Sequence, residues 1–228
     1  NFQTLETYEH YVDMALYTGY TSFGVASSNT TGDTYFTNVA TIAEVIAKSG
    51  SGAIDVTYTA TAKAGTQAQA VEMSGYTGTL TIAGVELVTI DNSTVKSTAT
   101  FTATSMQTLT VTGDKKLTIA AAIPAGTVVV DASATTGGFS VITQQTAAYG
   151  VAFTGGSGAD SLNVQTNLDT TTVADGGDGV DTILVGDPAD ITALKAAGIS
   201  NFEILGASAS STGTINTSYV TGLSGVAG

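Results

Sequence analysis

The sequence predicts a mainly β protein, namely a β-solenoid or β-helix preceded by a small helical region. The first observation is the composition: aromatic residues make up only 7% and charged residues only 11% of the 228 residues, and small or β-branched residues fill most of the rest. Such residues favour thin, regular β-structure. The second observation is an alternation of apolar and polar residues from about residue 53. The third is the nearly constant spacing of the alternating segments.

The first fifty residues carry a different pattern, so we divide the chain into a helical N-terminal region, 1–50, and a solenoid-like domain, 51–228. In segment 4–19 the apolar residues recur at intervals of three and four, which is typical of an amphipathic helix. In segment 38–50, Ile42 and Ile46 share one helical face, and Asn38 stands where an N-cap is expected. Both segments are therefore predicted to be helices.

The rest of the chain consists of short segments with a period of two, separated by glycines or polar pairs. Three apolar pairs are each 21 residues apart: Leu80 and Phe101, Leu109 and Val130, and Leu162 and Ile183. A coil of about twenty residues with two or three short strands is typical of a solenoid, in which each coil buries its apolar face against its neighbours. An antiparallel sandwich with strands of similar length is the alternative.

One segment near the C-terminus, 187–198, interrupts this β pattern. Asp190 is placed to cap a short helix, with Ile191 and Leu194 facing inward and Gly198 at its end. Segment 202–205 then predicts a further strand.

The charge of the chain excludes several classes of protein. Its net charge is −13, and all six basic residues are lysines. Phosphate backbones and anionic membrane surfaces would repel such a chain, so we expect neither a nucleic-acid partner nor membrane-surface binding. There is no cysteine and no apolar run long enough for a membrane span. The first residues show no signal peptide, and we expect the chain to be a fragment or a processed product.

Motifs for catalysis are missing as well. The single histidine, His10, has no second histidine with which to form a zinc protease motif. Ser93 and Lys96 match a short S-x-x-K pattern, but the motifs that accompany it in lactamase-type enzymes are not present. We therefore predict that the chain is not an enzyme.

Two nonapeptides carry the most specific pattern in the chain. GGSGADSLN (155–163) and GGDGVDTIL (176–184) both match G-G-x-G-x-D-x-U-x, where U is a large apolar residue. Glycines allow a tight turn, and Asp160 and Asp181 add carboxylates to it. Two such turns stacked one coil apart would gather about six oxygens, which suits Ca²⁺, a cation that takes six to eight oxygen ligands.

The nonapeptides resemble the calcium-binding repeats of RTX proteins, and the wider frame resembles the RTX-type S-layer proteins of Gram-negative bacteria. The segments that carry this resemblance are GVELVTI (84–90), QTLTVTG (107–113), TVVVDASATTGGFSVI (127–142), GVAFTGGSGADSLNV (150–164), GGDGVDTILVG (176–186) and ISNFEIL (199–205). The resemblance implies a secreted structural protein of the bacterial cell surface, exported by a type I apparatus. It also implies assembly of identical subunits into a lattice, and anchoring to a cell-surface polysaccharide would involve regions outside this chain.

The resemblance also implies a ligand set for Ca²⁺. One turn would supply the carbonyls of Gly155 and Ser157 and the carboxylate of Asp160. The other would supply the carbonyls of Gly177 and Gly179 and the carboxylate of Asp181, and Asp178 is a further candidate ligand in a variable position of the motif.

Two departures from the RTX pattern limit this expectation. RTX repeats usually follow one another every nine residues, whereas the two copies here are 21 residues apart, so we expect few ions and place one at this pair. Asp131, one coil earlier, lacks the full motif, and a turn-stabilising role competes there with a ligand role. An adhesin, or a non-catalytic segment of a larger RTX exoprotein, is the alternative to a surface-layer subunit.

Overall fold

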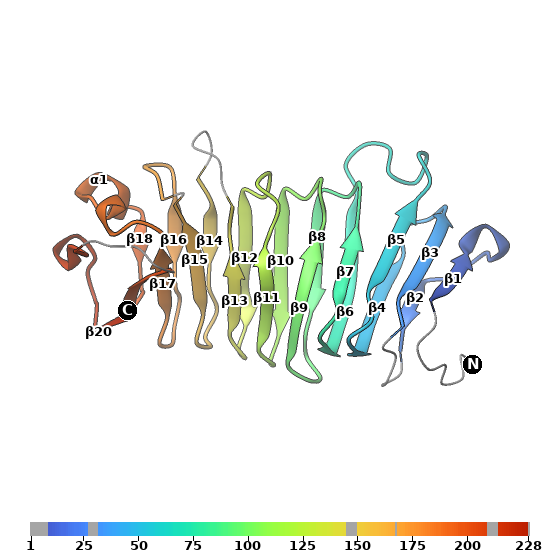
Figure 1. The fold of residues 1–228 in the computed structure, drawn as a ribbon, viewed down its shortest axis with the longest axis horizontal. Helices are drawn as coiled ribbons and strands as arrows, with labels where there is room; N and C mark the ends of the chain where they lie inside the picture. The colour runs from blue at the N-terminus through green and yellow to red at the C-terminus, as the bar shows by residue number, and fades with distance from the viewer. Residues whose placement is uncertain (1–8, 27–31, 145–149, 167, 209–213, 228) are drawn as a thin grey trace.

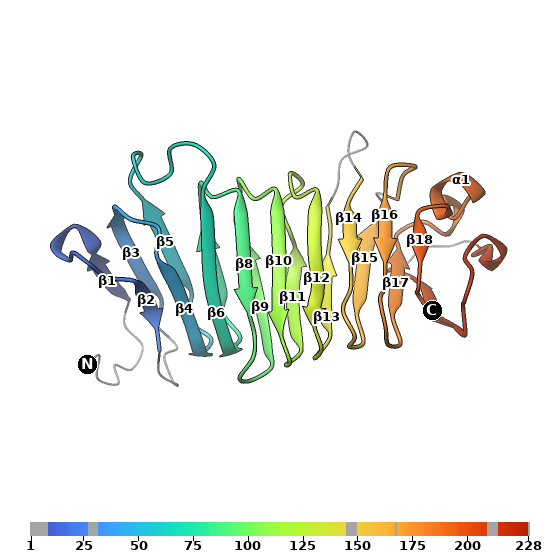
Figure 2. The same cartoon turned by 180° about the vertical axis from the view of Figure 1, so that it is seen from behind.

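The fold is a two-sheet parallel β-solenoid of about 10 coils, seen in a computed structural model (Figure 1). The structure describes residues 9–26, 32–144, 150–166, 168–208 and 214–227. Each coil places one strand in each of two sheets, and the coils stack along the long axis of the molecule (Figures 1 and 2). The parallel pairing confirms the solenoid and excludes the antiparallel sandwich.

The strands fall into two sheets by alternation along the chain. The eleven-stranded sheet contains, in order, β1 (His10–Asp13), β3 (Thr34–Val39), β5 (Ile54–Tyr58), β7 (Thr79–Ile82), β9 (Ser97–Thr102), β11 (Leu117–Ala122), β13 (Phe139–Ile142), β15 (Ser161–Gln165), β17 (Thr182–Val185), β19 (Ile204–Ala207) and β20 (Gly225–Ala227). The nine-stranded sheet contains β2 (Ser22–Val25), β4 (Glu44–Gly50), β6 (Ala68–Tyr76), β8 (Leu87–Asp91), β10 (Thr108–Gly113), β12 (Val129–Thr135), β14 (Ala152–Thr154), β16 (Val173–Asp175) and β18 (Ile199–Ser200).

The strand register follows the spacing of the apolar residues. All three pairs predicted from the 21-residue spacing are register partners on neighbouring strands: Leu80 with Phe101, Leu109 with Val130, and Leu162 with Ile183. Their side chains are buried between the two sheets, in a single core that runs through the stack of coils. Because side chains of a strand alternate between its two faces, the intervening Thr and Ser residues lie on the outer faces.

The solenoid already begins at β1, so the predicted helices of the first fifty residues are corrected. Segment 38–50 forms the end of β3 and all of β4, not a helix. Val45 and Ala47 are buried alternately in β4, which pairs with β2 and β6 on either side. Stacking onto the neighbouring coils therefore overrides the helical spacing, which fits the sequence equally well. In segment 4–19 the structure has β1 and the single 3₁₀ turn η1 (Met14–Leu16), and residues 1–8 lie outside the described ranges.

The predictions for the C-terminal segment hold in part. A 3₁₀ turn, η2 (Pro188–Asp190), precedes a one-turn helix, α1 (Ala193–Ala196), but Thr192 caps that helix and not Asp190. Ile191 is buried as expected, whereas Leu194 is 77% exposed. The strand predicted at 202–205 is confirmed from Ile204 onward, as β19, whereas Phe202 precedes that strand; a further 3₁₀ turn, η3 (Thr217–Tyr219), follows it. In the part of the chain that the structure describes, no helix is long and apolar enough to cross a membrane.

Candidate metal centre

The two nonapeptides form two stacked turns on one edge of the solenoid. Turn 155–160 connects β14 to β15, and turn 176–181 connects β16 to β17 in the next coil. Ser161 and Thr182, which follow the two turns, are register partners. Both turns lie on the lower edge in Figure 1, where each coil passes from the nine-stranded to the eleven-stranded sheet. The expected stacking of the two turns, one coil apart, is therefore present.

The glycines of these turns are required by the close approach of neighbouring coils. A Cβ atom added to Gly155 would lie 2.0 Å from the carbonyl oxygen of Gly176 in the next coil. A Cβ on Gly177, whose φ is +88°, would lie 2.2 Å from the carbonyl oxygen of Gly156. Backbone atoms cannot move aside as side chains can, so glycine is needed here whether or not an ion is bound.

A ladder of carboxylates runs across the same turns. Asp160 Oδ1 accepts a hydrogen bond from the backbone N–H of Phe139 at 2.6 Å, one coil earlier. Asp181 Oδ1 accepts one from the N–H of Asp160 at 2.7 Å, and Glu203 Oε2 accepts one from the N–H of Asp181 at 2.8 Å. Each acid thus binds the amide at the corresponding position of the preceding coil. The motif indicates Asp160 and Asp181, but the ladder also includes Glu203.

The two aspartates differ in their second oxygen. Asp160 Oδ2 accepts the N–H of Gly156, in its own turn, at 2.7 Å. The corresponding amide one coil later belongs to Gly177, and it donates instead to Asp175 Oδ1 at 3.1 Å. Asp181 Oδ2 is consequently buried with no hydrogen-bond partner among the described residues. A buried carboxylate oxygen of this kind needs a partner, since its desolvation is otherwise uncompensated.

The electrostatic environment of Asp181 reflects this lack of a partner. The pKa of Asp181 is raised from 3.8 to about 6, chiefly by burial, with smaller contributions from the charges of Asp160, Glu203 and Asp175, while the hydrogen bond from the Asp160 amide lowers it. Burial also raises the pKa of Asp160, but the two amides that bind its carboxylate oppose that effect. Near neutral pH, a cation beside Asp181 would offset both the burial and the neighbouring negative charges.

Backbone carbonyl oxygens are further candidate ligands for a metal ion. Within the described ranges, the carbonyls of Gly155, Ser157, Gly177 and Gly179 accept no hydrogen bond, so they remain available as ligands. The side chain of Asp178 is exposed at the surface of its turn. No group of three or more Asp, Glu, His or Cys side chains converges to hold a metal ion in the part of the chain described. The residues thus fit Ca²⁺ only if carbonyls supply most of the ligands, as a hard cation permits.

Asp131 belongs to a turn-stabilising arrangement. Its Oδ1 accepts hydrogen bonds from both the backbone N–H and the hydroxyl of Ser133, at 3.0 and 2.6 Å. This is the Asx-type arrangement that competes with metal binding in the sequence prediction.

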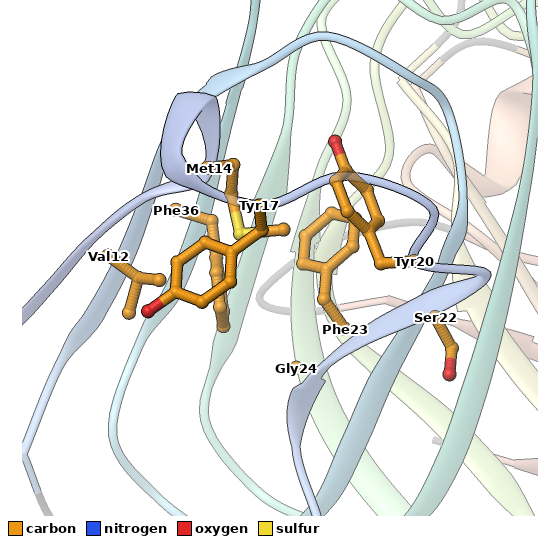
Figure 3. Close-up of a pocket in the computed structure, with 8 residues that line it drawn as sticks. All are labelled: Val12, Met14, Tyr17, Tyr20, Ser22, Phe23, Gly24 and Phe36. Atoms are coloured by element: carbon orange, nitrogen blue, oxygen red, sulfur yellow. The ribbon is translucent and has the colours of Figure 1, made fainter.

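An apolar pocket lies at the opposite end of the solenoid. It has a volume of about 430 Å³, and Figure 3 shows its lining residues. Rings of Tyr17, Tyr20, Phe23 and Phe36 form most of the wall, with Phe23 and Phe36 packed edge to face at 5.0 Å. Among the described residues, no Asp, Glu, His or Lys side chain lines this pocket.

No protein-family model, curated protein or solved structure matches this chain. Its fold and turns therefore define the class of protein to which it belongs: a parallel two-sheet β-solenoid with stacked glycine turns. Within that class, its particular feature is the buried carboxylate ladder, with one oxygen left without a partner.

Proposed function

We propose that this chain is a non-catalytic structural protein whose solenoid is stabilised by Ca²⁺ at turns 155–160 and 176–181. The observation that carries the proposal is Asp181 Oδ2, a fully buried carboxylate oxygen without a hydrogen-bond partner in the described structure. A cation there would neutralise the carboxylate and bring it together with the free carbonyls of the two turns. Gly155, Ser157, Gly177 and Gly179 would provide the carbonyl ligands, Asp160 and Asp181 the carboxylates, and Asp178 would add a ligand from the surface.

The fold supports a structural role. A continuous core runs through all coils, and outer faces of Thr and Ser offer little that could hold a substrate. We further propose, from the RTX resemblance, that the protein is secreted and acts as a subunit of a self-assembling surface layer. Ca²⁺ is scarce in the cytosol and abundant outside cells, so binding would add stability only after export.

Thermal unfolding with and without a chelator tests the calcium proposal. We expect Ca²⁺ to raise the melting temperature measured by circular dichroism, and EGTA to reverse the effect. Asp181→Asn should remove this response. Asp169→Asn is a matched control, because it removes the same charge from a loop on the opposite edge, where Thr171 and Thr172 bind the carboxylate. An unchanged melting temperature in EGTA and in Ca²⁺ would refute the calcium site.

Electron microscopy addresses the surface-layer proposal separately. A lattice subunit should form ordered sheets when Ca²⁺ is added to the purified chain. A chain that binds Ca²⁺ but remains in small particles would contradict the surface-layer role and favour an adhesin or a segment of a larger exoprotein.

A further inference from the structure

The edge that carries the glycine turns also carries a basic patch and an acidic patch, which lie several coils apart. Three of the six lysines lie there in two successive coils: Lys96 precedes β9, and Lys115 and Lys116 precede β11. The N–H of Ser97 donates to the carbonyl of Lys116 at 3.0 Å, which places Lys96 and Lys116 side by side. Lys115 forms an ion pair with Asp114 at 2.8 Å. Lys96 and Lys116 are exposed and form no ion pair with the described residues.

The acidic patch lies three to four coils further along the same edge. Asp178 is exposed there, and Glu203 is partly exposed in the next coil. Neighbouring strands are about 4.8 Å apart, so Lys96 and Asp178 are about 19 Å apart along the edge. This separation exceeds the screening length of about 8 Å at physiological salt. The two patches therefore do not neutralise each other within one chain.

The turn midway between the two patches is neutral and small. Turn 136–138, Thr-Gly-Gly, connects β12 to β13 and lies two coils from the turn that carries Lys96 and two coils from the turn that carries Asp178 (Figure 1). Two exposed apolar side chains are placed symmetrically about it: Val95 is 49% exposed two coils before this turn, and Val180 is 57% exposed two coils after it. Each valine is adjacent to, or two residues from, a charged side chain of its patch.

We propose that two copies of this chain associate through this edge, antiparallel, about a two-fold axis at turn 136–138. The axis brings Lys96 of one copy to Asp178 of the other and Val95 of one copy to Val180 of the other. Each contact occurs twice, as a two-fold interface requires. The small glycine turn lets the two edges approach at the axis. The contact needs no ion, and it supplies one of the subunit contacts of the proposed lattice while resting on the charge pattern alone.

The edge is narrow, so the contact is weak and dependent on salt. Its area is limited to about five turns, which is below the size of a standard protein interface. The association should therefore strengthen at low ionic strength, where charge complementarity acts over a longer range.

Sedimentation equilibrium of the full chain in EGTA tests the proposal, with charge reversals on each patch. We expect wild-type protein to dimerise at low salt and dissociate at high salt. Lys96→Glu/Lys116→Glu and Asp178→Lys should each weaken self-association by about tenfold or more, since exposed ion pairs contribute up to about 1 kcal/mol each and every pair occurs twice. An equimolar mixture of these two variants should regain association, because their edges are again complementary. Lys63→Glu is the matched control on the opposite edge, and it should behave as wild type.

Each alternative result is informative. A wild-type chain that stays monomeric at low salt overturns the proposal. If that monomer instead binds an anionic polysaccharide such as alginate through Lys96 and Lys116, the patch serves a polymer and not a second copy. Dimers that survive both charge reversals would place the contact elsewhere on the molecule. Because Ca²⁺ is absent from the experiment, failure of the calcium site and failure of this contact are distinguishable.

Discussion

Replacing Asp181 with asparagine should stabilise the protein in the absence of Ca²⁺ and remove its response to Ca²⁺. The asparagine oxygen can still accept the N–H of Asp160, which lies 2.7 Å from Asp181 Oδ1. The substitution removes the buried negative charge and replaces the oxygen that has no partner with an NH2 group. Most single substitutions at buried positions destabilise a protein, so a gain in stability is a specific outcome.

The pKa of Asp181 sets the size of this gain. The pKa rises from 3.8 to about 6, and each unit corresponds to about 1.36 kcal/mol, so ionising Asp181 costs the folded state up to about 3 kcal/mol at neutral pH. A change of 1 kcal/mol shifts the melting temperature of a chain of this size by about 2–4 °C. In EGTA at pH 7, Asp181→Asn should therefore melt up to about 10 °C above wild type.

The pH dependence gives the same prediction with an independent readout. The folded state holds the proton of Asp181 to higher pH than the unfolded state does, so this group favours folding most below pH 3.8. Its contribution is lost as the pH rises to about 6. Wild-type protein in EGTA should lose up to about 3 kcal/mol over this range, and Asp181→Asn should not show this loss.

Asp160→Asn is a control variant that should lower the stability of the protein, whereas Asp181→Asn should raise it. Both oxygens of Asp160 accept backbone N–H groups, at 2.6 and 2.7 Å, and an asparagine can accept only one of them. This variant should lose about 1–3 kcal/mol. If Asp181→Asn also lowers the melting temperature in EGTA, the Asp181 carboxylate is a satisfied structural group, and the reasoning that assigns it to a cation is wrong.

Three further predictions follow from the same structure. Ca²⁺ binding should release about three quarters of a proton at about pH 5.5 and almost none at pH 8, measured by calorimetry in buffers of different ionisation enthalpy, because Asp181 must ionise to bind. Gly177→Ala should cost more than about 2 kcal/mol in urea unfolding, whereas Gly65→Ala, with a similar positive φ and no atom within 4 Å, should cost only about 1 kcal/mol; equal losses would contradict the close approach of coils. Leu162→Ala, at a fully buried position, should cost about 2–5 kcal/mol, and Leu194→Ala, at a 77% exposed position, less than about 0.5 kcal/mol.

The fold could be predicted from the sequence where the pattern belongs to the coil itself. The 21-residue spacing of pairs such as Leu162 and Ile183 reflects direct stacking of strands, so the register follows from counting residues. The helix predicted at 38–50 failed because the spacing of Ile42, Val45 and Ile46 also fits a turn followed by a strand. Only the neighbouring strands β2 and β6 decide between the two, and they lie 22 to 26 residues away.

The candidate site could be predicted in outline and not in detail. The nonapeptides indicate Asp160, Asp181 and the glycine turns, because these residues recur at one coil's distance. The turn that carries Glu203 has three residues, whereas turns 155–160 and 176–181 have six. It lacks the glycines of the nonapeptides, so no motif indicates Glu203. A signal does exist, since Glu203 directly precedes a strand just as Asp181 does. The oxygen without a partner on Asp181 depends on which acceptor the Gly177 amide selects, and this is a property of the folded turn alone.

The carboxylate ladder gives the solenoid a direction of completion. Each acid accepts a hydrogen bond from a backbone N–H in the preceding coil. The hydrogen bonds of a turn are therefore complete only when the following coil is in place. In a chain that folds from its N-terminus onward, the amide of the last folded turn would lack its carboxylate partner until the next coil has folded. Loss of the final coils would therefore weaken a coil that is itself intact, and damage at the C-terminal end would spread backwards one turn at a time.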